Sequence, residues 1–347
     1  MSAAHNEPAH PGNAARLIEL YYEQGWTDGL PVVPPSEESV GAMLAAAGLR
    51  GNDLIGEVFE RHARLTADKV AVNAVLAGCR PAYMPVVVAA MRGLLHKDYH
   101  YHGAATSTGG SSVAVIVNGP IARELEINSG TNALGPGTRA NATIGRAVRL
   151  TMMNALNTRA PKLDRSTLGN AGKYSLCFAE NEAASPWEPL HVERGFKAGE
   201  STVTVFAAEG HIQIYNQLSA DAETLCRTMA DAMSQLGSMG IVGQPQTVVI
   251  FAGEHQEVFR KAGWSRARVR QCLYDHARRT IADAKRAGRL PGRLEPKDES
   301  TWRHAVARPE DILMVAAGGD AGAFSACLPG WGSGTLCRAV TTRIERP

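Results

Sequence analysis

The segment Ser112-Val-Ala-Val-Ile-Val-Asn118, followed by Gly119-Pro120, decides the fold class of this chain. Its unbroken apolar run predicts a strand buried on both faces, as in sheets that are covered on both sides. Similar runs at 247–251 and 312–316 predict two more buried strands. Because helical patterns lie between the strands, the sequence predicts an α/β fold of mixed or mostly parallel sheets flanked by helices, in two lobes.

The composition along the chain suggests three parts. Residues 1–13 are small and polar, without an apolar run, and predict a disordered tail. Residues 14–170 and 171–347 are each long enough to bury a core, so we expect an N-terminal and a C-terminal α/β lobe. The second lobe includes a basic segment, 255–308, which we expect to be helical and solvated; a partner surface or a funnel for anions is the alternative. A glycine-rich loop is expected at 317–333, after the last buried strand.

Composition excludes several classes of protein. The chain has 347 residues, of which 44% are hydrophobic and 20% charged, as in folded globular proteins. Thirty-six basic residues against 34 acidic ones leave a formal charge of +2, so we expect neither nucleic acid nor a membrane as a partner. No run approaches the roughly 18–20 apolar residues of a membrane span, and no signal peptide is evident. The six cysteines form no Cys-x-x-Cys pair, which predicts reduced thiols and a cytoplasmic location.

Cys79 is the strongest candidate for a reactive thiol. It lies in Ala77-Gly-Cys-Arg-Pro81, between a Gly that ends one predicted helix and a Pro that begins the next. The positive N-terminus of the second helix and the Arg80 guanidinium would both lower the pKa of the thiol, as nucleophilic and redox cysteines require. The alternative is a small apolar residue buried at a helix–helix corner.

A polar segment from Ala179 to Phe196 follows one of the predicted strands. It contains four carboxylates, a His, an Arg and a Trp in a loop fixed by prolines, and such a loop supplies general acid–base groups. We expect Glu180, Glu182 and His191 to act as acid–base residues and Trp187 to contact the substrate. A structural lid or a subunit contact is the alternative.

Two further groups of residues are candidates for binding. His100 and His102 would point to the same face if their segment were extended, and could then hold one divalent metal with help from the segment around His191. The glycine-rich loop before residue 139 leads into a predicted helix, so Asn132, Arg139 and Asn141 are expected to clamp an anionic substrate. Neither a P-loop nor a Rossmann fingerprint occurs, so no nucleotide is indicated, and the identity of any cofactor stays open.

Five segments carry a family resemblance: Gly25–Pro35 (GWTDGLPVVPP), Ala77–Pro81 (AGCRP) with Met84-Pro85, Val117–Pro120 (VNGP), Asn141–Arg146 (NATIGR) and Glu180–Gly195. They resemble a bacterial family associated with the UGSC (seleno)proteins, which are named for a selenocysteine-Gly-Ser-Cys motif. This chain lacks Cys-Gly-Ser-Cys and has only Gly332-Ser-Gly-Thr-Leu-Cys337. The resemblance implies thiol or selenol chemistry, on this chain or on a separate subunit, and it implies no particular reaction.

The leading hypothesis is therefore a cytoplasmic enzyme acting on a small polar or anionic organic substrate. Cys79 would supply nucleophilic or redox chemistry, with acid–base help from His191 and either Glu180 or Glu182. One alternative is a metal-dependent hydrolase or lyase that uses His100, His102 and His191. Another is a non-catalytic subunit whose partner carries the reactive Cys or selenocysteine. Either a homo-oligomer or such a heteromer is expected.

Overall fold

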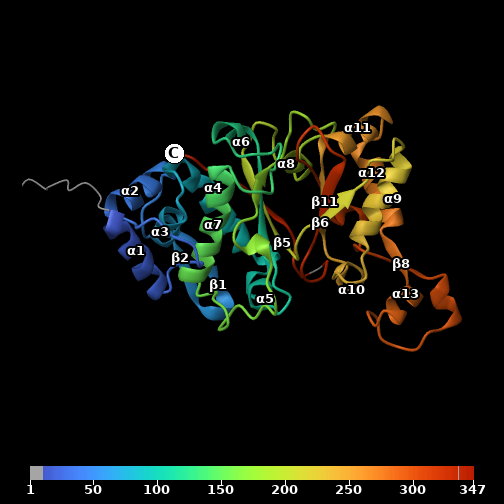
Figure 1. The fold of residues 1–347 in the computed structure, drawn as a ribbon, viewed down its shortest axis with the longest axis horizontal. Helices are drawn as coiled ribbons and strands as arrows, with labels where there is room; N and C mark the ends of the chain where they lie inside the picture. The colour runs from blue at the N-terminus through green and yellow to red at the C-terminus, as the bar shows by residue number, and fades with distance from the viewer. Residues whose placement is uncertain (1–10, 335) are drawn as a thin grey trace, which may run out of the picture.

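Two four-stranded sheets lie face to face at the centre of the molecule (Figure 1). The computed structural model describes residues 11–334 and 336–347. Within these residues, helices cover the outer face of each sheet, giving four layers in the order helix, sheet, sheet, helix. This arrangement confirms the predicted α/β fold with mixed sheets flanked by helices.

The first sheet, called sheet B, has the strand order β12-β5-β3-β4. Its strands β3 and β4 are parallel, whereas β5 is antiparallel to both of its neighbours. Because β3 occupies a central position, its residues are paired on both sides, as the apolar run at 112–118 predicts. The strands are β3 (Ser112–Asn118), β4 (Cys177–Ala179), β5 (Thr202–Ala208) and β12 (Val340–Arg343).

The second sheet, called sheet C, has the strand order β10-β7-β11-β6. Here β7 and β10 form the parallel pair, and β11 runs antiparallel to β7 and β6. Each sheet thus contains one parallel pair. The strands are β6 (Ile212–Tyr215), β7 (Thr247–Phe251), β10 (Ile312–Ala316) and β11 (Phe324–Pro329).

Alternate residues of each strand enter different apolar layers. In β3, Ala114 and Ile116 face sheet C, whereas Val115 and Val117 pack under the helices of sheet B. The same alternation runs through β7 and β10. Since successive side chains of a strand point to opposite faces, a strand covered on both sides must be apolar throughout. This explains the unbroken runs in the sequence.

Helices α4 and α7 cover the outer face of sheet B, α3 packs on these two helices, and α1 and α2 lie on the far side (Figure 1). Local signals set their ends. Ser36 caps α2, since its Oγ accepts a hydrogen bond from the Ser39 amide at 3.1 Å. Gly78 ends α3 with φ of 86°, in the left-handed region that glycine tolerates. The bounds are α1 (Pro11–Glu23), α2 (Glu37–Ala46), α3 (Ala67–Ala77), α4 (Met84–Leu94) and α7 (Arg139–Asn154).

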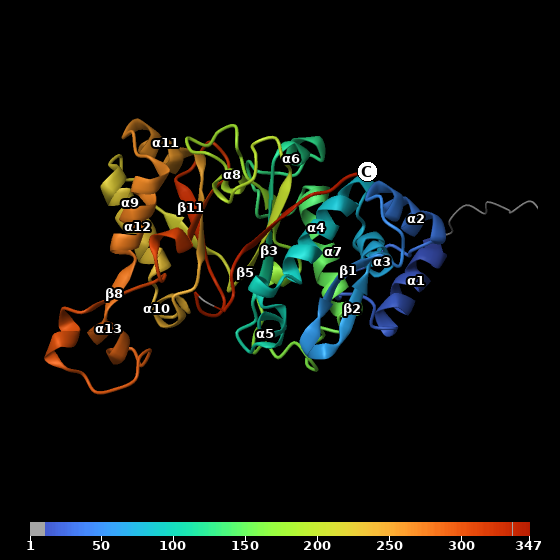
Figure 2. The same cartoon turned by 180° about the vertical axis from the view of Figure 1, so that it is seen from behind.

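The outer face of sheet C is covered by α9 (Ala222–Met233), α11 (Gly253–Lys261) and α12 (Arg266–His276). After α12 the chain forms a small unit that projects from the layers in both views (Figures 1 and 2). It pairs β8 (Arg278–Thr280) with β9 (Trp302–His304) around α13 (Ile281–Arg286). The prediction of a helical segment over 255–308 therefore holds only in part, because beyond residue 276 the helical elements are α13 and the 3-10 turn Pro296–Glu299.

Short elements complete the described chain. The hairpin of β1 (Leu54–Val58) and β2 (Ala63–Thr66) precedes α3. Four short helices are α5 (Tyr101–Thr106), α6 (Pro120–Glu124), α8 (Leu190–Glu193) and α10 (Gly240–Gly243). Single 3-10 turns occupy Phe59–Arg61, Pro81–Tyr83, Lys97–Tyr99, Ala171–Lys173, Pro296–Glu299 and Pro309–Asp311. None of the helices in the described ranges is long and apolar enough to cross a membrane.

Three predictions from the sequence differ from the structure or lie partly outside the described residues. Residues 1–10 of the expected tail lie outside the described residues, while 11–13 belong to α1. The expected boundary at residue 170 cuts through sheet B, because β3 precedes it and the other three strands follow. The expected loop at 317–333 contains β11, whose residues enter both apolar layers of sheet C.

The layer between the two sheets yields a testable prediction. Phe178 of β4 is fully buried in it, so replacing Phe178 with Ala should lower the free energy of unfolding by about 3–5 kcal/mol. The matched change Phe324→Ala removes a ring that is 42% exposed at the start of β11 and should cost less than about 1 kcal/mol. Urea unfolding followed by circular dichroism measures both. Equal losses in the two variants would contradict the face-to-face packing.

Candidate functional site

Polar residues gather where β3 and β4 end, at the same edge of sheet B. Asn118 is the last residue of β3, and Glu180 follows β4 directly. The Asn118 amide nitrogen Nδ2 donates to Glu180 Oε2 at 2.6 Å and to Glu182 Oε1 at 3.0 Å. With His191 these three residues form what we call the Glu180 cluster. The carboxyl ends of parallel strands are where α/β proteins place their ligands.

Glu180 is a buried carboxyl held from both sheets. Its residue is 4% exposed, and its Oε2 also accepts a hydrogen bond from the Leu190 amide at 2.8 Å. Oε1 lies 3.4 Å from the amide nitrogen of Ala316, at the end of β10 in sheet C. Burial raises the pKa of Glu180 to about 7, although these hydrogen bonds and the Arg266 charge act in the opposite direction. Glu180 can therefore exchange a proton near neutral pH.

His191 lies in the same cluster and is completely buried. Its Nδ1 is 3.7 Å from Glu182 Oε1, and that oxygen also accepts a hydrogen bond from the Gly119 amide at 2.7 Å. Neither ring nitrogen of His191 has a hydrogen-bond partner among the described residues, and neither does Asn118 Oδ1. A buried polar atom without a hydrogen-bond partner costs free energy of folding, and the Glu180 cluster contains these three. The prediction that Glu180, Glu182 and His191 come together is in accord with this geometry.

An ion pair fixes the rest of the polar loop. Arg266 at the start of α12 donates through Nη2 to the Met314 carbonyl at 2.6 Å and pairs with Glu193 at 2.9 Å. Arg270, one turn later, also pairs with Glu193. These contacts tie the loop after β4 to β10 and α12. They also place a buried positive charge near Glu180, which limits how far its pKa rises.

A cavity of about 530 Å³ lies beside this loop. Ala184 and Pro186 form one side of it, and the other side comes from residues that follow β7 and β10, among them Gly253, Gln256 and Asp320. Gln256 is 5% exposed, and its Oε1 has no hydrogen-bond partner in the described part of the chain. The cavity thus opens at the carboxyl ends of the parallel pair of sheet C. Its size is within the range of small-molecule sites.

Trp187 belongs to the same loop, but its side chain packs against the protein and does not line the cavity. Its indole Nε1 donates to the Trp264 carbonyl at 3.1 Å, and its ring packs edge-on against Phe251 at 5.1 Å between centroids. The side chain therefore joins the apolar layer under α11 and α12. The expected contact of Trp187 with substrate has no support in this geometry.

Cys79 has an environment opposite to the expected one. The residue is 6% exposed, and its thiol donates to the Thr143 carbonyl at 3.3 Å. Burial raises the pKa of Cys79 to about 12, because desolvation outweighs the favourable charges of Arg139 and Arg146. The Arg80 side chain, expected to activate the thiol, is exposed. The prediction of a lowered pKa is wrong, and the alternative of a buried apolar residue fits better.

The three residues expected to clamp an anion form hydrogen bonds with the backbone instead. Arg139 donates through Nε and Nη2 to the Gly78 carbonyl, at 3.1 and 2.9 Å, and so joins α7 to the end of α3. Asn141 bonds the backbone of Asn128 in both directions, and Asn132 donates to the Pro136 carbonyl. These side chains organise the loop before α7. They do not converge on a free binding position.

The two histidines of His100-Tyr-His102 are not arranged as expected. His100 has φ of 55° and caps α5, whereas His102 lies within that helix. Because residues two apart on a helix point away from each other, the prediction of an extended metal-binding pair is wrong. In the described part of the chain, the one cluster of three or more potential metal ligands consists of Glu223, Cys272 and His276. His191 is in no such cluster.

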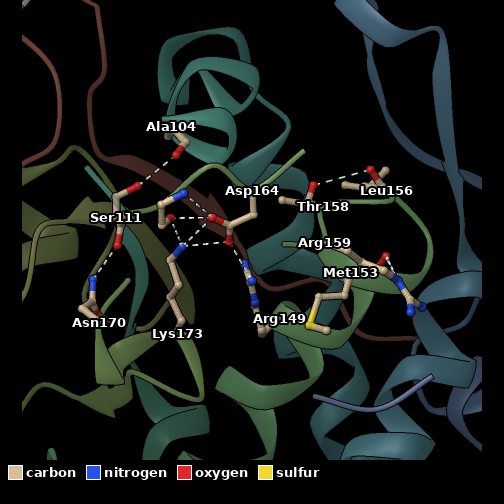
Figure 3. A network of polar contacts seen from close by, with 12 residues as sticks. Ala104, Ser111, Arg149, Met153, Leu156, Thr158, Arg159, Asp164, Asn170 and Lys173 are labelled. Atoms are coloured by element: carbon tan, nitrogen blue, oxygen red, sulfur yellow. Dashed lines mark hydrogen bonds and ion pairs between the residues drawn. The ribbon is translucent and has the colours of Figure 1, made fainter. Parts of the chain in front are cut away.

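A second polar network, which the sequence did not reveal, lies at the opposite end of β3 (Figure 3). Asp164 is 3% exposed and pairs with Arg149 at 2.9 Å and with Lys173 at 2.8 Å. Burial alone would raise the pKa of Asp164, but hydrogen bonds from Lys173, Ser166 and Arg149 lower it well below its ordinary value. The loop pattern Asp164-x-Ser166 was visible in the sequence, but its partners are distant along the chain.

The Asp164 network borders a surface cavity of about 400 Å³, which Arg149 and Lys173 line together with Tyr174. Every oxygen of the Asp164 carboxylate is already paired with these cations or with Ser166. Such a network mainly anchors the loop between α7 and β4. The Glu180 cluster, with its unsatisfied imidazole and its titratable carboxyl, remains the better candidate site.

Comparisons with protein-family models, curated proteins and solved structures found no match to this chain. The resemblance to a family associated with the UGSC (seleno)proteins therefore stays a prediction.

Stability measured against pH tests the environment of Glu180. The folded chain keeps this carboxyl protonated up to a pKa of about 7, whereas the unfolded chain releases the proton near the ordinary value of 4.5. Between these values the folded state binds more protons, so stability falls as pH rises, by roughly 3 kcal/mol in total. Glu180→Gln should lack this part of the pH dependence.

The measurement is urea unfolding of both proteins at about pH 4 and about pH 8. Glu188→Gln serves as the matched control, since Glu188 is exposed in the same loop and should keep the wild-type pH dependence. If wild type and Glu180→Gln lose stability equally between the two pH values, the carboxyl is not desolvated as described.

Proposed function

We propose that this chain is an enzyme that transfers a proton to or from a small polar organic substrate, with Glu180 as the group that exchanges it. The observation that carries the proposal is the buried Glu180 carboxyl at the carboxyl ends of parallel strands, with its pKa raised to about 7. A general acid or base works best when its pKa lies near the working pH. Strongly shifted pKa values in a polar cluster are typical of active sites.

The neighbouring residues have distinct roles in this proposal. Asn118 donates to both carboxylates and holds them in place. Glu182, whose side chain is 28% exposed, connects the buried carboxyl with solvent and lies next to His191. His191 then offers a ring nitrogen for a hydrogen bond to substrate, since the described protein satisfies neither nitrogen. A cavity whose wall contains Ala184 and Pro186, in the same loop as Glu182, offers space for a small substrate.

The proposal assigns the chemistry to the carboxyl and imidazole groups and leaves the thiols out. All six cysteines are free and buried. Burial raises the pKa of Cys79, Cys327 and Cys337 to about 12 in each case, so little thiolate is available at neutral pH. The free thiols support a reducing, cytoplasmic location, which we also propose.

Carbon-bound hydrogen exchange tests this function without a known substrate. The full chain is incubated in D₂O with a panel of small carboxylic, hydroxy and oxo acids, and loss of carbon-bound proton signals is followed by NMR. We expect exchange in at least one compound. Glu180→Gln should slow it by at least about 100-fold, as for removal of a general acid or base.

Two control variants separate the alternatives. Glu188→Gln, an exposed carboxylate of the same loop, and Cys79→Ser should both exchange at the wild-type rate. Loss of exchange in Cys79→Ser would restore the thiol mechanism. The proposal fails if no compound of the panel exchanges, or if Glu180→Gln retains the wild-type rate.

A further inference from the structure

Helices α9 and α12 bring three side chains with metal-binding atoms together on the outer side of sheet C. Glu223 Oε1 lies 2.9 Å from His276 Nε2, and Glu223 Oε2 lies 3.6 Å from Cys272 Sγ. The three ligand atoms all lie within 4.8 Å of one another. Carboxylate oxygen, imidazole nitrogen and thiolate sulfur together are a donor set that zinc binds readily.

The sequence spacing explains why these side chains meet. Cys272 and His276 are four residues apart on α12, so they lie on one face of that helix, one turn from each other. Glu223 lies in the first turn of α9, which packs against α12 and begins at the N-cap Asp221. The pair Cys-x-x-x-His is therefore presented by one rigid helix, and the carboxylate comes from its neighbour.

The separations are close to those of a tetrahedral metal site. Zinc binds Cys sulfur at about 2.3 Å and nitrogen or oxygen at about 2.0–2.2 Å, so sulfur and oxygen ligands lie roughly 3.6 Å apart and nitrogen and oxygen ligands roughly 3.4 Å. Cys272 Sγ lies 3.6 Å from Glu223 Oε2, whereas His276 Nε2 lies 2.9 Å from the other carboxylate oxygen, Oε1, so ion binding requires a small shift of the Glu223 carboxylate. That side chain is 44% exposed.

The surroundings leave the cluster open to an ion and supply a second sulfur. Cys272 is 8% exposed and the His276 side chain 23%, so an ion can reach both from solvent. Cys226, one turn after Glu223 on α9, is a second buried cysteine beside Cys272. Arg227 also donates to Glu223, at 3.0 Å, but its side chain is 59% exposed and can move into water.

We propose that Glu223, Cys272 and His276 bind one divalent cation of the zinc class. Three protein ligands leave one position of a tetrahedral ion for water or a small ligand. The ion joins α9 to α12 and so fixes the helical cover of sheet C. The site is separate from the Glu180 cluster, and its residues have no role in the proposed proton transfer.

Cobalt titration tests this site directly. Reduced, chelator-treated full-length chain is titrated with Co²⁺, and absorption is recorded in the near ultraviolet and the visible. We expect one ion per chain, with a thiolate-to-cobalt charge-transfer band and the visible bands of a tetrahedral ion. Zn²⁺ should displace the cobalt, abolish the bands and raise the unfolding temperature, since it binds the folded state.

Variants assign the ligands. Cys272→Ser and His276→Gln should each weaken Co²⁺ binding by more than about 100-fold, because each removes one ligand atom suited to the ion. Cys327→Ser is the matched control, because Cys327 is a buried free cysteine of β11 outside the cluster, and it should bind as wild type does.

Circular dichroism shows whether each variant is folded. If a ligand variant unfolds, the Co²⁺ spectrum of the wild-type chain still tests the site, because it requires no variant. A wild-type chain that shows no charge-transfer band on saturation with Co²⁺ overturns the site. A band that persists in folded Cys272→Ser overturns it as well, since the sulfur ligand must then come from elsewhere.

Discussion

Both faces of both central sheets are covered, and the rest of the structure follows from this constraint. Sheet B is covered on one side by α4 and α7 and on the other by sheet C, whose outer face lies under α9, α11 and α12. A polar side chain within a central strand loses its water and costs several kcal/mol unless it finds a partner, as Thr204 does with Thr341. Polar and titratable groups are therefore concentrated at the ends of strands, where loops can supply hydrogen bonds.

Glu180 shows what this constraint does to a single carboxyl. It stands just past β4, at the point where the two sheets approach each other, and the backbone there is shared: the Asn181 amide donates to the Ala316 carbonyl at 2.7 Å. The carboxyl is bonded by Asn118 from sheet B and lies 3.4 Å from the Ala316 amide of sheet C. Desolvation at this junction raises its pKa to about 7. The same packing that joins the sheets thus produces the proton-exchanging group.

The features that the sequence predicts well are those fixed by neighbours along the chain. The strands at 112–118, 247–251 and 312–316 have the predicted limits, because their apolar runs end at Gly, Pro or polar residues. Gly78 ends α3 in the left-handed region as expected. The proximity of Glu180, Glu182 and His191 is predictable because one short segment holds all three, directly after a strand.

The features that the sequence misses depend on packing between distant segments. The pKa of Cys79 is set by burial under other helices, and local charges alone suggested the opposite direction. His102 lies in a helix, although its short segment is equally compatible with an extended form. The Asp164 network and the Glu223, Cys272 and His276 cluster each join residues from separate elements. No local pattern encodes such contacts.

The pKa of Glu180 measured directly is the most decisive test of this account. Side-chain carboxyl carbons are labelled with ¹³C in glutamate, and the Glu180 signal is assigned from its absence in Glu180→Gln. Its chemical shift is then followed against pH. The account predicts a midpoint at a pKa of about 7, and a midpoint near the ordinary value of 4.5 would contradict it.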